Sequence, residues 1–321
     1  MTAPSTSPAV APGVRIDPHA MMSIRNLELR ARVIVQGFWS GIHRSPYHGF
    51  SAEFTEYRQY TAGDDPRYLD WRVYARSDRY FVKKFEDETN VRCHLLVDQS
   101  RSMAYGSVGY SKASYAATLA ATLAYFLHLQ GDAVGLLTFD EKVRDYLPAR
   151  HRTGHLRQLM LALDRSGSGA ATDIVAAVDR ITGLVRKRGL VTLVSDFLAP
   201  IDALEPRLVA LAACGHEVDM FQVLDPAERD LGLKHASRLE DLETRSILYV
   251  DPARERTEYR RRLDTHVAAL RSMCDRLGIG FHPLSTAEPL GNALFGFLQQ
   301  RLRRGRLHRP TAGARRVGGV A

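Results

Sequence analysis

Residues 93–102 read Cys93-His94-Leu95-Leu96-Val97-Asp98-Gln99-Ser100-Arg101-Ser102, a short apolar run that ends at an aspartate and two alternating serines. Further apolar runs follow at Ala133–Phe139, Leu190–Val194, Val218–Leu224 and, more weakly, Ile279–Leu284. Each run is short and bounded by turn residues, which is typical of strands buried on both faces. The sequence therefore predicts that residues 93–97 form the first strand of a buried sheet.

Helical patterns separate these runs. The segment from Lys112 to Gln130 carries large apolar residues on one side and alanines around the rest, with Ser111 as its N-cap and Gly131 as its stop. A similar spacing from Ile24 to Trp39 predicts a helix that packs on the main domain. Strand and helix in alternation predict parallel strands joined by right-handed crossovers, hence a doubly wound, mainly parallel α/β sheet flanked by helices.

Composition and pattern divide the chain into four parts. We expect a disordered N-terminal tail rich in Ala, Pro, Ser and Thr (1–20), an N-terminal segment (21–90), the α/β domain (91–300) and a basic C-terminal tail (301–321). Residues 227–250 break the alternation of strands and helices, which predicts a hairpin inserted before a helix from Arg254 to Leu277.

The 321-residue chain has a formal net charge of +8, with much of the excess in arginines after residue 300. A basic tail can contact nucleic acid, but the aromatic residues of a base-stacking surface are missing there, so we do not expect a nucleic-acid partner. No apolar run reaches the roughly 20 residues that span a bilayer. The N-terminus also lacks the basic-then-apolar pattern of a secretory signal, and we expect a cytoplasmic protein without a transmembrane segment.

Asp98, Ser100 and Ser102 directly follow a predicted strand, at the carboxyl edge of the sheet, where ligand sites of such folds lie. Thr172 begins a later helical pattern, and Asp196 ends the run Leu190–Val194, so both are expected near the same edge. A hard cation such as Mg²⁺ takes about six oxygen ligands and tolerates hydroxyls where carboxylates supply charge. These five residues predict a site for Mg²⁺, or for Mn²⁺ or Ca²⁺, with one coordination position left for a partner's carboxylate.

An alternative explanation needs no metal. Serines that follow a strand often cap a helix or close a turn, and an isolated Asp-x-Ser-x-Ser is more commonly that. The metal site is favoured because Thr172 and Asp196 follow in order, each at a helix start or a strand end.

The same residues resemble the metal-ion-dependent adhesion site (MIDAS) of von Willebrand factor A domains, which is Asp-x-Ser-x-Ser with a later Thr and a later Asp. Flanking motifs resemble the bacterial family called domain of unknown function 58 (DUF58). They are Gly49–Tyr60, Gly63–Trp71, Tyr74–Arg76, Lys83–Glu86, Ser102-Met103, Val194–Phe197, Leu224–Pro226 and Asp241–Thr244. The resemblance covers residues 22 to 305 and makes residues 21–90 a family-specific segment.

This resemblance implies a von Willebrand factor A-like domain. It also implies a function in protein binding rather than catalysis, as an adaptor or chaperone-like partner of the MoxR-type AAA+ ATPase that is often encoded beside such genes. Many members carry membrane-spanning segments, and none is predicted here.

A Mg²⁺-dependent hydrolase is the rival function, because Asp64, Asp65 and Asp70 could hold a metal of their own. Arginines and aromatic residues are interleaved with them, which favours ion pairs and packing instead. Residues 106–113 lie between a strand and a helix but lack the Gly-Lys-Ser/Thr order of a phosphate-binding loop, so this segment is interpreted as a turn into the helix.

Overall fold

The fold is that of a computed structural model, which describes residues 17–43, 57–59, 74, 76, 80–83, 91–165, 172–233, 235–240 and 247–307. A six-stranded sheet forms its centre, with strand order β10-β7-β6-β3-β4-β5. The strands are β3 (Arg92–Asp98), β4 (Ala133–Phe139), β5 (Val143–Arg150), β6 (Leu190–Ser195), β7 (Glu217–Leu224) and β10 (Gly280–Ser285). All neighbouring pairs are parallel except β4 and β5.

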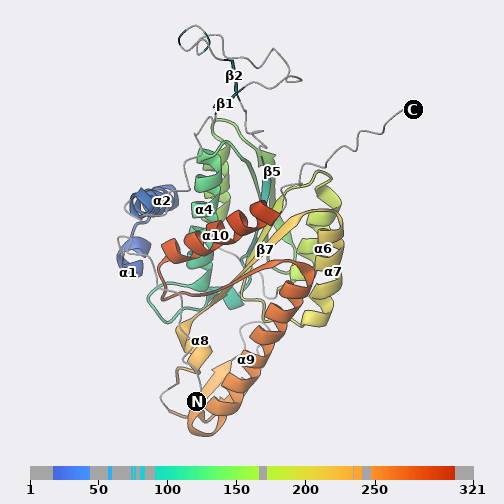
Figure 1. Ribbon diagram of the computed structural model, residues 1–321. Coiled ribbons are helices and arrows are strands. Elements are labelled where there is room, and N and C mark those ends of the chain that lie inside the picture. Colours follow the sequence, from blue (N-terminus) through green and yellow to red (C-terminus); the bar gives the residue numbers. More distant parts are fainter. Residues whose placement is uncertain are drawn as a thin grey trace, which may run out of the picture.

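Helices cover both faces of this sheet (Figure 1). One face carries α2 (Leu27–His43), α4 (Lys112–Leu129), α5 (His155–Leu163) and α10 (Leu290–Leu307). The other carries α6 (Ile174–Leu184), α7 (Ile201–Ala213) and α9 (Pro252–Leu277). Because apolar strand residues point alternately into these two layers, the strands are buried on both sides. The predicted doubly wound, mainly parallel α/β fold is confirmed.

The helix α4 packs on the sheet through many buried alanines, and its buried residues also include Tyr115 and Phe126. Its N-cap is Ser111, as the sequence predicted, and the hydroxyl of Ser111 accepts a hydrogen bond from the backbone amide of Ser114. The expected helix before the sheet is α2, and it packs on α4. There the ring of Trp39 stacks on Phe126 with 5.9 Å between centroids.

The strand β5 was not predicted. Its residues Val-Arg-Asp-Tyr-Leu-Pro-Ala-Arg carry charges and a proline, so no apolar run marks it. It is one of the two edge strands of the sheet and pairs with β4 in a hairpin. Proline is tolerated at a sheet edge because no neighbouring strand needs its missing N–H.

Two predicted boundaries differ from the structure. Residues 18–20 were expected in a disordered tail but belong to α1 (Pro18–Met22), which Asp17 caps through the amide of His19. Residues 301–307 were expected to begin the basic tail, but α10 continues to Leu307. Arginines are frequent both within residues 301–307 and after them, so composition alone did not reveal where the helix ends.

Shorter elements complete the described part. They are β1 (Tyr57–Gln59) and β2 (Phe81–Lys83), which pair with each other, the 3-10 turn η2 (Ser102–Ala104), α8 (Pro226–Asp230), and the strands β8 (Ser237–Glu240) and β9 (Ile247–Val250). The antiparallel pairing of β8 with β9 confirms the inserted hairpin before α9. In the described part of the chain, every helix is too short or too polar to cross a bilayer.

Candidate functional site

Asp98 ends β3 at the carboxyl edge of the sheet, between β4 and β6. Its carboxylate is fully buried and accepts two hydrogen bonds. The backbone amide of Ser100 donates to Oδ1 at 2.8 Å, and the hydroxyl of Ser195, at the end of β6, donates to Oδ2 at 2.6 Å. The carboxylate is therefore held in one orientation by the two loops that leave neighbouring strands.

The two serines of the loop face each other. The hydroxyl oxygens of Ser100 and Ser102 lie 3.1 Å apart, and the hydroxyl of Ser102 donates to Oδ2 of Asp196 at 2.9 Å. Hydrogen bonds thus connect Ser100, Ser102 and Asp196 directly, and Asp98 joins them through the amide of Ser100 and through Ser195, the residue that precedes Asp196. Four of the five predicted metal ligands therefore lie together at the carboxyl edge of the sheet.

Thr172, the fifth predicted residue, is half-buried and precedes α6. The next residue, Asp173, donates its backbone amide to the carbonyl of Asp140 at 2.8 Å. Asp140 directly follows Phe139, the β4 residue that pairs with Asp98. The structure therefore places Thr172 in a loop at the carboxyl end of β4, one strand away from Asp98.

The turn that presents Asp196 has an unusual backbone. Phe197 is buried and adopts a φ of +51°, a region that costs a non-glycine residue on the order of 1–3 kcal/mol. The side-chain amide of Gln222 donates to the carbonyl of Asp196 at 3.0 Å, and the ring of His266 on α9 donates to the carbonyl of Phe197 at 2.7 Å. These contacts keep a strained turn in place beside the candidate site.

Lys112 is a member of the site that the sequence did not reveal. Its side chain is 0% exposed, and its ammonium nitrogen donates to Oδ2 of Asp196 at 2.9 Å and to Oε1 of Glu228 on α8 at 2.7 Å. A lysine at the first position of an alanine-rich buried helix was the only available signal, and it fitted a turn residue equally well.

The charges of four neighbouring side chains, those of Asp98, Asp196, Glu228 and Lys112, together are equal and opposite to the charge of a divalent cation. Asp98, Asp196 and Glu228 carry three negative charges when ionised, and Lys112 carries one positive charge, which leaves two negative charges. Burial, together with repulsion from Asp196, raises the pKa of Asp98 to about 6. Burial would lower the pKa of Lys112, but Asp196 and Glu228 outweigh it and raise that pKa above its usual value.

The raised pKa of Asp98 predicts that ionisation of this carboxylate destabilises the folded, metal-free protein. The unfolded chain ionises Asp98 near pH 4 and the folded chain only near pH 6, so stability falls as the pH rises between these values. A shift of about two units corresponds to 2–3 kcal/mol at most. We expect Asp98→Asn to be more stable than the wild type in EDTA at pH 7 and to lose that advantage at pH 4.

Urea denaturation of both proteins at the two pH values measures this difference. Equal stability differences at pH 4 and pH 7 would contradict the buried, repelled state of the Asp98 carboxylate.

The donor set fits a hard cation. Carboxylate and hydroxyl oxygens are the ligands that Mg²⁺ prefers, whereas histidine and cysteine favour softer metals. Among the described residues, no histidine or cysteine is hydrogen-bonded to the side chains of Asp98, Ser100, Ser102 or Asp196. The described residues contain no cluster of three His, Cys, Asp or Glu side chains arranged for a metal, and the predicted set has two carboxylates. The rival acidic block at Asp64, Asp65 and Asp70 lies outside the described residues.

The chain is similar to several known proteins. The chain is 30% identical over 251 residues to the uncharacterized protein Rv1480 of Mycobacterium tuberculosis. The aligned region covers 77% of this chain and 78% of the relative. Among solved structures it is similar to the conserved hypothetical protein BatB from Bacteroides thetaiotaomicron, with 15% identity, a TM-score of 0.46, and coverage of 67% of this chain and 99% of that one. The VWA domain of SpRpn10 matches with 13% identity, a TM-score of 0.40, and coverage of 64% and 94%.

The family model described as "Protein of unknown function DUF58" matches residues 56–272, which is more than half of the chain. This chain therefore belongs to the DUF58 family.

Proposed function

We propose that this protein is a metal-dependent protein-binding module, in which Asp98, Ser100, Ser102, Thr172 and Asp196 hold Mg²⁺ and a carboxylate of the partner completes its coordination. The observation that carries the proposal is the hydrogen-bonded set of oxygen donors at the end of β3 and β6. When bound, the ion supplies a Lewis-acidic anchor for a carboxylate.

Binding rather than catalysis is supported by the way these side chains are used. The hydroxyls of Ser100 and Ser102 bond to each other and to a carboxylate, and no histidine of the described structure bonds to either of them. A serine nucleophile would need an adjacent base that takes its proton. Asp98 has a pKa raised to about 6, but both its oxygens already accept hydrogen bonds that orient it.

A MoxR-type AAA+ ATPase is the partner that we propose. Membership in the DUF58 family supports it, since resemblance to this family implies that such genes often stand beside genes for ATPases of this type. An ATPase of this kind would offer the missing carboxylate from an acidic side chain on its surface. The chain would then act as an adaptor that carries the ATPase to a client protein.

Capture of a purified MoxR-type AAA+ ATPase on the immobilised protein tests this function. We expect capture in buffer with Mg²⁺ and loss of at least about tenfold in EDTA, because the bridging ion is removed, with recovery when excess Mg²⁺ is added back. The capture should be carried out without nucleotide, so that Mg²⁺-ATP on the ATPase does not change between the two arms. Equal capture with and without EDTA would reject metal-dependent binding.

A further inference from the structure

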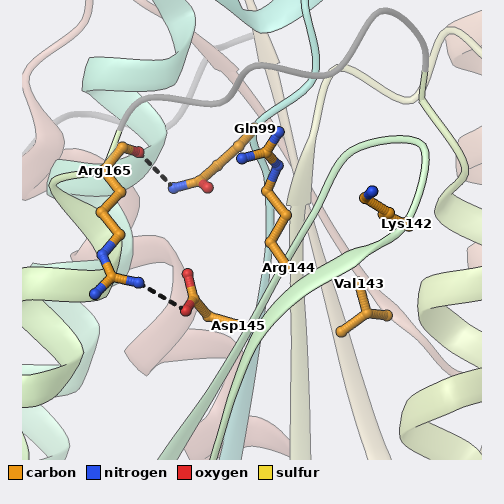
Figure 2. A pocket seen from close by; sticks show the side chains of 6 residues that line it. All are labelled: Gln99, Lys142, Val143, Arg144, Asp145 and Arg165. Atoms are coloured by element: carbon orange, nitrogen blue, oxygen red, sulfur yellow. Dashed lines mark hydrogen bonds and ion pairs between the residues drawn. The ribbon is translucent and has the colours of Figure 1, made fainter.

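A basic pocket of about 450 Å³ lies directly beside the loop of the candidate metal site (Figure 2). It is lined by Gln99, Lys142, Val143, Arg144, Asp145 and Arg165. Gln99 comes from the loop itself, between Asp98 and Ser100, and residues 142–145 come from the turn and the first part of β5. We call this space the β5 pocket.

The walls of the β5 pocket are fixed by internal contacts. The side-chain amide of Gln99 donates to the carbonyl of Arg165 at 3.1 Å, and the guanidinium of Arg165 pairs with Asp145 at 3.0 Å. Arg144 forms an ion pair with the buried carboxylate of Asp140. Figure 2 shows Arg165 and Lys142 on opposite sides of the space, with Arg144 between them.

Positive charge exceeds negative charge in this pocket. Three cationic side chains line it against one carboxylate, that of Asp145. The ammonium of Lys142 is exposed and has no hydrogen-bond or ion-pair partner among the described residues, and the guanidinium of Arg165 is 67% exposed. An unpaired ammonium at a preformed concave site is a point of attraction for an anion.

We propose that the β5 pocket binds a second acidic side chain of the same partner whose first carboxylate completes the metal site. The partner would then be recognised through an acidic segment rather than through one carboxylate. This inference rests on the proposed function, because the metal supplies the first anchor. It goes beyond that function by stating that the partner's binding segment is acidic, and it assigns the recognition of the second acidic side chain to Lys142.

The β5 pocket and the proposed ion adjoin within one loop, because Gln99 lines the pocket and directly follows Asp98. An extended segment spans at most about 3.3–3.6 Å per residue. The proposal therefore places the two acidic residues of the partner within a few positions of each other. Two linked contacts also bind more tightly than either contact alone, because the second forms within an already bound segment.

Binding to short immobilised Gly/Ser peptides tests the inference. One peptide carries a single Glu, a second carries two Glu residues separated by two positions, and a third carries phosphoserine in place of the second Glu. In Mg²⁺, we expect the two-Glu peptide to bind the wild type more tightly than the other two. Lys142→Glu should weaken that binding roughly tenfold, because an attractive charge becomes repulsive.

Lys187→Glu is the matched control. Lys187 is also exposed, but it precedes β6 and therefore lies at the opposite edge of the sheet from Asp98. Its charge reversal changes the net charge of the protein by the same amount, so equal weakening by both variants would indicate a general charge effect and overturn the inference.

The remaining outcomes separate the pocket from the metal. Binding that needs Mg²⁺ but is equal for one and two Glu residues overturns the pocket and leaves the proposed function standing. Binding that needs two Glu residues and Lys142 but survives EDTA supports the pocket and rejects metal dependence. A preference for the phosphoserine peptide overturns a second carboxylate as the occupant of the β5 pocket, and no binding of any peptide overturns an acidic segment as the partner.

Discussion

Replacement of Lys112 by methionine is expected to destabilise the metal-free protein by about 3–5 kcal/mol, the cost of removing one partner from a buried ion pair. The Lys112 ammonium is fully buried and lies within 2.9 Å of a carboxylate oxygen of both Asp196 and Glu228. Methionine has a similar length and fills the space, so the variant removes the charge with little loss of packing. Two carboxylates would then remain at this edge without their cation.

Urea denaturation in EDTA and in Mg²⁺ measures this effect. We expect a smaller loss in Mg²⁺, since a bound dication neutralises Asp196 in place of the ammonium. The double variant Lys112→Met with Glu228→Gln should recover part of the stability, because it removes one of the two unpaired charges. A loss below about 1 kcal/mol in EDTA would show that Lys112 is not the cation that balances this edge.

Replacement of Asp98 by alanine is expected to abolish Mg²⁺-dependent binding while the fold is retained. Asp98 contributes one of the two carboxylates of the proposed set and is the one whose orientation both flanking loops fix. Changes to residues that only support a metal ligand cost about 10- to 100-fold in affinity, so loss of a ligand should cost at least about 100-fold. We also expect Mg²⁺ to raise the melting temperature of the wild type and to leave that of Asp98→Ala unchanged.

Matched serine variants separate a metal effect from general damage to the loop. Ser100 belongs to the proposed site, whereas the hydroxyl of Ser107 bonds to Asp225 at the end of β7. Both substitutions to alanine remove one hydroxyl from the same sheet edge. We expect Ser100→Ala to weaken Mg²⁺ binding and Ser107→Ala to leave it unchanged.

The fold was predictable where burial imposes a simple pattern. Strands such as β3 and β6 are covered on both faces, so their sequences are continuous apolar runs that stand out from helices. The edge strand β5 is covered less and carries charges, so its sequence does not distinguish a strand from a loop. Its place next to β4 depends on a hairpin turn and on pairing, which no local pattern encodes.

The candidate site was predictable to the same extent. Parallel strands bring their carboxyl ends to one edge, which is why Asp98 and Asp196 could be placed together although they are far apart in sequence. Lys112 and Glu228 could not be placed there, because their meeting depends on how α4 and α8 approach the sheet. The β5 pocket was missed for a related reason, since one of its walls belongs to the unpredicted strand.

Titration of the metal-free protein with Mn²⁺, followed through the electron paramagnetic resonance signal of the free ion, tests most directly whether this edge holds a divalent cation. We predict one saturable site per wild-type chain, competition by Mg²⁺, and loss of that site in Asp98→Ala. No saturable binding by the wild type, or equal binding by Asp98→Ala, would contradict the metal site and the function proposed for it.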